Sequence, residues 1–365
     1  MKYPKLIFAF LSVSLFQNCT QKNDSDTPKE LTIIAINKDF LLSEVNQSQF
    51  IALDTIDLER PGNPSLTSIW DIAFTENNIF LMDVKQGFLK YDYEGNFLQK
   101  IGKKGEGPDE YLVPMAIYVD DKENIALVGD WSKMVVNSYD LEGNYISSSK
   151  KLPGLPISFY KEKDKVLIIQ EGVDIDQKDQ QTVLISSIEP TTLEFKTQGN
   201  PLYSFTSKFH RMHSFLSVFG QLNDTSLFYF PRVRLEGLTD QKDTIYRMQE
   251  DHLVPEYQLD FTDFGKSDTL RIQSAEINNG YASILLGFKK DSYHLLLDLE
   301  KRTPKFSMKL SSESYSYEVF PKHLKEDSYY AIIRNEDDNE EKNPNIVLYN
   351  LSMETSIQLK EKVPH

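Results

Sequence analysis

The sequence predicts an all-β protein built from repeated four-stranded antiparallel sheets, and three observations support this. Tyr91–Phe97 (YDYEGNF) recurs as Tyr139–Tyr145 (YDLEGNY), a shift of 48 residues (139 − 91). An apolar run that ends in aspartate precedes each copy, at Asn78–Asp83 and Asn124–Asp130. No stretch keeps the i, i+3, i+4, i+7 apolar spacing of a helix. The Glu-Gly-Asn pieces supply the positive φ angle that a tight hairpin needs.

Weaker copies of the unit follow along the chain. They begin at Val183, Thr244, Leu295 and Ile346. The last copy includes a further strand-like run, Ile357–Leu359. The six units have a mean step of about 52 residues, and repeats of this length made only of short strands are typical of β-propeller blades. We therefore predict a six-bladed β-propeller of four-stranded antiparallel blades over residues 30–365.

Two additional strand-like runs, Leu31–Ile36 and Phe50–Asp54, precede the first repeat. We expect one of them to pair with the C-terminal strands, so that an N-terminal strand closes the ring. The alternative architecture is a pair of stacked β-sandwich domains. The repeat at 48 residues argues against that alternative.

The N-terminus has the features of a signal peptide. Lys2 and Lys5 precede the uncharged run Leu6–Phe16, which is too short to span a membrane. Cys19, the single cysteine of the chain, follows directly. We interpret residues 1–18 as a lipoprotein signal peptide and Cys19 as the site of lipid attachment, although Phe16 and Asn18 differ from the usual lipobox. The alternative is an ordinary cleaved signal with an incidental cysteine.

Residues 19–29 are polar, lack aromatic side chains and are expected to form a flexible tether. Its Gln-Lys and acidic residues resemble the surface-export signal of some Bacteroidota lipoproteins, although Asn23 and Ser25 interrupt the acids. No later segment is long and apolar enough to span a membrane, so we expect the lipid alone to hold the protein to the outer membrane, on its periplasmic or its surface-exposed face.

Charge and cysteine content exclude two classes of protein. The chain has 40 Lys+Arg against 55 Asp+Glu, a net charge of −15, and loss of residues 1–18 brings this to about −17. Nucleic acid is therefore not an expected partner, because binding it requires a basic surface. One cysteine cannot form an internal disulfide, so a disulfide framework is excluded as well.

Several segments resemble a known family. Ile101–Tyr111 (IGKKGEGPDEY) is similar to a glycine-rich segment of six-bladed β-propeller lipoproteins of Bacteroidota, which are related in shape to NHL-repeat and TolB-like propellers. Asp243–Tyr246 and Phe50–Thr55 look like further segments of the same family, with Asp54 where the family more often has glutamate. The resemblance covers nearly the whole chain after the tether. It implies the propeller fold and an envelope location, and no general activity.

Three charged or glycine-rich segments could be mistaken for ligand sites. Gly102–Gly107 lacks the following helix and the Lys-Ser/Thr of a phosphate loop, so we interpret it as the crossing between the first two blades. The alternative is a binding loop with Glu110 and Tyr111 as its reactive ends. Asp174–Asp179 lacks the ligand pattern of a calcium loop, and Asp337–Lys342 is expected to be a charged surface loop.

The candidate binding residues are few. Arginines near an inner strand of a blade can point into a propeller's channel and bind carboxylate or phosphate oxygens, although inter-blade salt bridges are the simpler interpretation. Trp70 and Asp71, at the head of the first repeat, either line the same channel or pack between blades. His210 and His213 lack a nearby third metal ligand, so no metal site is predicted. The full set of candidates for the channel or face is Trp70, Asp71, His210, Arg211, His213, Arg232 and Arg234.

Two hypotheses of function follow. The first is a lipid-anchored binding module for a glycan, a peptide or an envelope protein, with no cofactor. The second is a metal-dependent enzyme of the lactonase or lyase type, with a site in the central channel that could include Ca²⁺. Converging carboxylate or imidazole groups in the channel would favour the enzyme, and an apolar or arginine-lined channel would favour the binding module.

The anchor leads to a direct prediction. Replacing Cys19→Ala removes the thiol that would carry the lipid, so we expect lipid labelling to disappear and the protein to leave the membrane fraction. Metabolic labelling with a fatty-acid analogue, followed by fractionation, measures both effects. Continued labelling of the variant would exclude Cys19 as the attachment site.

Overall fold

The computed structural model describes residues 31–42, 50–162, 165–173, 180–197, 203–206, 219–223, 226–229, 243–249, 252–265, 270–278, 280–310, 322–325, 328–333 and 342–351. Strands dominate these residues, and the helical segments among them are α1 (Lys38–Leu42) and a 3-10 turn at Thr262–Phe264. No helix in the described ranges is long and apolar enough to cross a membrane. The prediction of an all-β protein is therefore confirmed.

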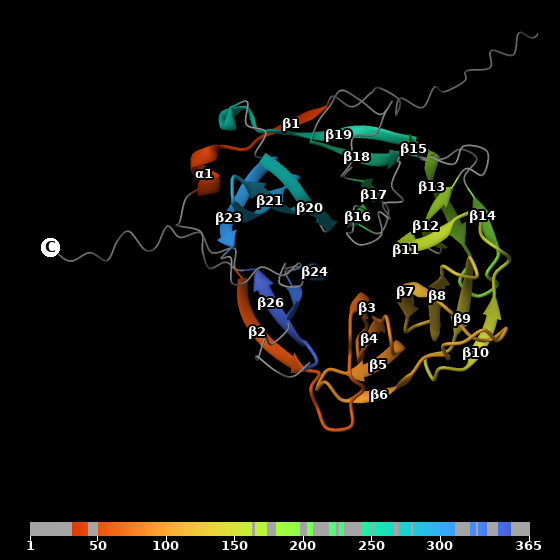
Figure 1. Cartoon of the computed structure of the whole chain (residues 1–365). Helices are drawn as coiled ribbons and strands as arrows, with labels where there is room; N and C mark the ends of the chain where they lie inside the picture. The colour runs from red at the N-terminus through yellow and green to blue at the C-terminus, as the bar shows by residue number, and fades with distance from the viewer. Residues whose placement is uncertain are drawn as a thin grey trace, which may run out of the picture. The chain divides into compact units, whose positions relative to one another are not determined.

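The two strongest copies of the repeat form two separate antiparallel sheets of four strands, drawn in orange and yellow in Figure 1. The first contains β3 (Ile69–Phe74), β4 (Asn78–Asp83), β5 (Gly87–Asp92) and β6 (Phe97–Lys100). The second contains β7 (Pro114–Asp120), β8 (Ile125–Asp130), β9 (Val135–Tyr139) and β10 (Tyr145–Ser148). In both sheets, strands that are adjacent in sequence are adjacent in space.

The third sheet has the same order and one additional strand. It consists of β11 (Leu155–Glu162), β12 (Lys165–Val173), β13 (Gln180–Ile188) and β14 (Phe195–Thr197), and β15 (Tyr203–Thr206) pairs with the other half of β13.

A nine-stranded sheet combines two further groups of four antiparallel strands. One group is β16 (Phe219–Asn223), β17 (Ser226–Tyr229), β18 (Thr244–Gln249) and β19 (His252–Asp260). The other is β20 (Leu270–Asn278), β21 (Tyr281–Phe288), β22 (Asp291–Asp298) and β23 (Thr303–Leu310). A single parallel contact, between Gln221 and Asn278, joins them. The N-terminal β1 (Thr32–Ala35) extends the first group by pairing in parallel with β19.

The last sheet combines the second strand of the chain with the last three described strands. Its strands are β24 (Lys322–Lys325), β25 (Ser328–Ile333), β26 (Asn345–Leu351) and the N-terminal β2 (Phe50–Asp57). The antiparallel pairing of β2 with β26 confirms that an N-terminal strand completes the C-terminal sheet. Ile357–Leu359, which we expected in this unit, lies outside the described residues.

The repeated Glu-Gly-Asn turns form because an aspartate organises each of them. Gly95 and Gly143 have φ angles of 85° and 88°, as the motif predicts. Asp92 accepts hydrogen bonds from the backbone N–H (2.8 Å) and the side-chain amide (2.8 Å) of Asn96. Asp140 and Asn144 repeat both contacts at 2.7 and 2.8 Å. Burial acts to raise the pKa of Asp92, but these hydrogen bonds hold that pKa below its ordinary value.

Successive sheets pack against each other through apolar side chains. Phe80 and Met82 of β4 form a buried cluster with Ile117 and Val128 of the next sheet. Comparable clusters join the β7–β10 sheet to the β11–β14 strands, the β20–β23 strands to the last sheet, and the last sheet to the β3–β6 sheet. The first strands of neighbouring groups also contact each other: β3 with β7, β7 with β11, β16 with β20, and β20 with β24.

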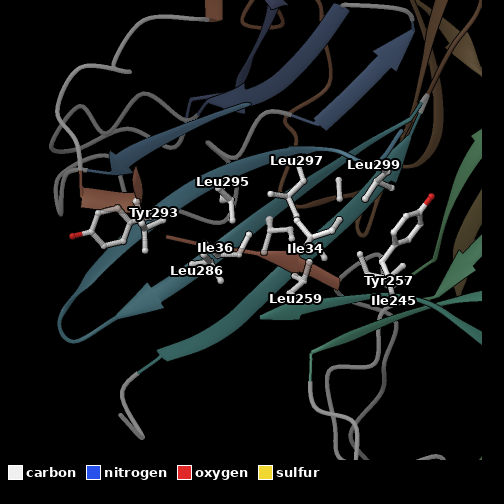
Figure 2. Packing of buried hydrophobic residues seen from close by; sticks show 14 of the residues in the cluster. Ile34, Ile36, Ile245, Tyr257, Leu259, Leu286, Tyr293, Leu295, Leu297 and Leu299 are labelled. Carbon is white, nitrogen blue, oxygen red and sulfur yellow. The ribbon is translucent and has the colours of Figure 1, made fainter. Parts of the chain in front are cut away.

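The largest buried cluster lies between the two halves of the nine-stranded sheet. Figure 2 shows Ile34 and Ile36, from β1 and the residue that follows it, among Leu259 of β19 and Leu295 and Leu297 of β22. The helix α1 continues from this segment, where the Asn37 side chain accepts hydrogen bonds from the backbone N–H groups of Asp39 and Phe40 in the first turn. The N-terminal segment is thus part of the core.

A histidine lies inside the strands of this region. His294 of β22 is completely buried, and its Nε2 shares a hydrogen bond of 2.7 Å with Ser283 Oγ of β21. Burial disfavours the charged imidazolium and lowers the pKa of His294 to about 3.

This histidine makes stability depend on pH. An unfolded chain protonates His294 near its ordinary pKa of about 6.5, whereas the folded chain resists protonation down to about 3. The free energy of unfolding should therefore fall by about 1.4 kcal/mol per pH unit as the pH drops below about 6.5. Urea unfolding of the native protein and of His294→Gln between pH 7 and 4.5 separates this effect from that of the carboxylates. Equal slopes for the two proteins would contradict the assignment.

Candidate functional site

Buried polar side chains at the ends of the second strands organise one end of the sheets. Asp83, the last residue of β4, is fully buried. Its Oδ2 accepts hydrogen bonds from the backbone N–H groups of Thr67 (2.7 Å) and Ser68 (2.9 Å), which lead into β3. Its Oδ1 accepts from the N–H groups of Lys85 (2.9 Å) and Gln86 (2.8 Å) in the β4–β5 turn. One carboxylate thus joins two loops.

Asp130, at the end of β8, repeats this arrangement in the next sheet. It is also fully buried and accepts from the N–H groups of Leu112 (2.7 Å) and Val113 (3.2 Å), which lead into β7. The N–H groups of Ser132 (2.9 Å) and Lys133 (3.2 Å), in the β8–β9 turn, donate to the same side chain. In the third sheet, Gln170 of β12 occupies the equivalent position.

Gln170, which is uncharged, also holds the loop that precedes the first strand of its sheet. Its Oε1 accepts a hydrogen bond of 3.2 Å from the backbone N–H of Gly154, which leads into β11. Its amide donates to Ser186 Oγ of β13. We name the loops held in this way the anchored end. It comprises residues 58–68, 84–86, 101–113, 131–134 and 149–154.

Several first strands carry a β-bulge, and in the first three sheets the bulge directly follows the residue that pairs with Asp83, Asp130 or Gln170. The extra residue is Trp70 in β3, Met115 in β7, Ile157 in β11 and Gln273 in β20. Bulges redirect side chains and occur often beside functional sites. The half-buried Trp70 is therefore the bulge residue of β3, next to the anchored end.

Asp71 uses its carboxylate to connect two first strands. Its Oδ2 accepts a hydrogen bond of 2.9 Å from the backbone N–H of Ile117 in β7, and its Oδ1 accepts from the N–H of Ile72. These contacts agree with the interpretation that Asp71 packs between neighbouring sheets.

Trp131 is a second aromatic residue at the anchored end, and the sequence analysis missed it. The indole Nε1–H donates a hydrogen bond of 2.7 Å to the carbonyl of Pro156 in β11. Its backbone N–H donates to the carbonyl of Val113. The half-buried ring is therefore held between the second and third sheets. Its position directly after the repeated aspartate was the one available signal.

The glycine-rich segment Ile101–Tyr111 is the crossing between the first two sheets, as we interpreted it. The buried Tyr111 hydroxyl donates to the carbonyl of Ile101 (3.0 Å) and accepts from the N–H of Phe88 (3.0 Å). Glu110 pairs with Lys103 (2.7 Å) and accepts from the N–H of Gly107 (2.9 Å). Glu110 and Tyr111, which we considered as the reactive ends of a binding loop, thus form hydrogen bonds that stabilise the crossing itself.

Two glycines of this crossing differ in backbone conformation. Gly102 has a positive φ angle of 63°, and Gly107 does not have a positive φ angle. Glycine is needed at positions 105 and 107 for a different reason, because the Glu110 carboxylate occupies the space where a side chain would start. A Cβ atom at Gly105 would lie 2.0 Å from Glu110 Oε2, and one at Gly107 would lie 3.0 Å from it.

The other candidate residues cannot be placed. His210, Arg211, His213, Arg232, Arg234 and Cys19 lie outside the described residues. Within the described part of the chain, His, Cys, Asp and Glu side chains form no group of three or more that could hold a metal ion. The site that can be built from observed contacts is therefore the anchored end with Trp70 and Trp131.

The anchoring contacts can be tested by removing one acceptor. Asp130→Ala leaves four backbone N–H groups without their carboxylate, so we expect the free energy of unfolding to fall by about 3 kcal/mol. We also expect faster proteolysis within residues 101–113. Urea unfolding and limited proteolysis measure these effects, with Glu106→Ala, an exposed side chain of the same loop, as the control. A loss no larger than that of the control would contradict the anchoring function.

Comparisons with known proteins place the chain in a family. The family described as a domain of unknown function (DUF4934) matches residues 32–362. No curated protein matches the sequence significantly. Similar solved structures include a Bacteroides fragilis protein that is inferred to be exported, with 16% identity and a TM-score of 0.61 over 88% of this chain and 99% of that one.

A member of the DUF4221 family from Bacteroides vulgatus is also similar, with 11% identity and a TM-score of 0.55 over 84% of this chain and 98% of that one. At these identities, the likeness concerns the fold alone. The family match covers most of the sequence and all of the described strands. The chain therefore belongs to the DUF4934 family.

Proposed function

We propose that this protein is an exported, lipid-anchored binding module of the cell envelope, built as a six-bladed β-propeller. Six groups of four antiparallel strands can be counted in the described residues, with β2 completing the last group. Contacts between first strands and apolar clusters between successive groups also fit this architecture. The signal-like N-terminus with Cys19 and the fold shared with a protein inferred to be exported support the location.

The order of the anchored end is the observation that carries the binding function. The buried side chains of Asp83, Asp130 and Gln170 hold its loops by accepting hydrogen bonds from their backbone N–H groups. Loops that are already ordered lose little conformational entropy when a partner binds. We infer that the partner binds here, where Trp131 supplies a fixed aromatic surface.

The carboxylates that lie within the strands beside this end favour binding over catalysis. Asp71, Asp83 and Asp130 each accept backbone hydrogen bonds, so their oxygens already serve the fold. A hydrolytic or lyase site needs carboxylates that can reach substrate or metal. The partner under this proposal is a glycan, a peptide or another envelope protein.

Capture of the native, anchored protein from its own membranes tests this function. A variant with a bulky, uncharged group at the exposed Ser132, Ser132→Tyr, should lose a partner that the native protein retains in mild detergent. The control Glu142→Tyr places the same group at the opposite end of the same sheet, and it should keep the partner. Equal recovery with both variants, read by mass spectrometry and glycan analysis, would exclude the anchored end as the binding surface.

A further inference from the structure

The two ends of the first two sheets carry opposite charge. At the anchored end, the loops between β4 and β5, β6 and β7, β8 and β9, and β10 and β11 contain six lysines against three acidic residues. These lysines are Lys85, Lys103, Lys104, Lys133, Lys150 and Lys151. At the opposite end, the four loops of the same sheets contain six acidic residues and one lysine. A lysine-rich surface within a chain of net charge −15 is a local exception.

Two of these lysines are held in place by backbone carbonyl groups. Lys104 Nζ donates to the carbonyl of Val84 (2.8 Å), and Lys133 Nζ donates to the carbonyls of Gly107 (2.6 Å) and Glu110 (2.6 Å). A carbonyl acceptor orients an ammonium group and leaves its full charge. Lys103 differs, because it forms an ion pair with Glu110.

Three further lysines are exposed and can contact a ligand directly. Lys85 lies in the β4–β5 turn, and Lys150 and Lys151 lie in the loop that leads into β11. The whole set thus comes from four loops that span three consecutive sheets. A small anion could touch only one or two of them, so a chain of negative charges fits the distribution better.

We infer that the anchored end binds a linear anionic polysaccharide that carries carboxylate or sulfate groups. This inference rests on the proposed binding function and names its ligand class. The lysines would contact the acidic groups, and Trp131, whose ring is fixed by the bond to Pro156, would contact the sugar rings. Nucleic acid carries the same sign of charge, but the excess of acidic residues over the rest of the molecule opposes a long, stiff polyanion.

Binding of defined polymers to the full mature chain in mild detergent tests the inference. Polygalacturonate supplies carboxylates, dextran sulfate supplies sulfates, and neutral dextran is the uncharged reference. We expect the two acidic polymers to bind and to alter tryptophan fluorescence, the affinity to fall as salt is raised, and dextran not to bind.

Charge-reversed variants locate the site. Lys85→Glu, Lys150→Glu and Lys151→Glu together should weaken the binding of both acidic polymers at least tenfold. The matched control, Lys122→Glu, Lys165→Glu and Lys196→Glu, makes the same change in net charge at exposed lysines elsewhere on these sheets. We expect the control to keep most of the affinity, because the interaction is local.

Each other outcome overturns the inference. Equal losses of polymer affinity in both triple variants would show that binding depends only on the overall charge of the protein. Stronger lysine-dependent binding to phosphatidylglycerol vesicles or to duplex DNA would replace the polysaccharide with a lipid surface or a nucleic acid. Failure of every acidic polymer to bind would remove the ligand class. The binding module itself would still stand in that case if Ser132→Tyr loses a partner in the membrane capture.

Discussion

A buried hydrogen-bond acceptor at the end of the second strand is the constraint on which the described structure depends most. Asp83 and Asp130 are fully buried away from bulk water, and their oxygens accept from N–H donors of the protein. The donors come from the loop before the first strand and from the turn after the second. Each sheet therefore fixes the path by which the chain arrives from the preceding sheet.

At the opposite end of the same sheets, aspartates have a different structural role. There, Asp92 and Asp140 organise tight turns by contacts within a few residues. These turns also contact preceding segments, because Gly95 accepts a hydrogen bond from the Asn63 side chain (2.8 Å) and Gly143 accepts one from the N–H of Gly102 (3.2 Å). At the anchored end, fully buried carboxylates make the long-range contacts, and this end also carries the lysines and Trp131. Order and positive charge thus coincide at one end, which is the physical basis for placing the binding surface there.

Local chemistry explains which features the sequence predicted well. The turns at Gly95 and Gly143 and the N-terminal strand in the last sheet followed from motif spacing and from apolar runs. Other features depend on residues that are distant in sequence. The parallel pairing of β1 with β19, the replacement of the repeated aspartate by Gln170, and the bond from Trp131 to Pro156 all require the folded structure.

The glycine-rich crossing shows the same limit within a single motif. Its pattern correctly indicated a structural connection, but it could not show which glycine needs a positive φ angle. Gly102 has that conformation, whereas Gly105 and Gly107 make room for the Glu110 carboxylate. A steric need of this kind depends on the position of a side chain and leaves no separate mark in the sequence. The candidates at residues 210–213, 232 and 234 lie outside the described residues.

Hydrogen–deuterium exchange resolved to single amides tests the central claim, that the anchored end is ordered before any partner binds. The account predicts slow exchange at the amides of Thr67, Lys85, Leu112 and Ser132 in the isolated protein, because each donates to a buried carboxylate. Exchange of these amides at the rate of an unstructured loop would contradict it.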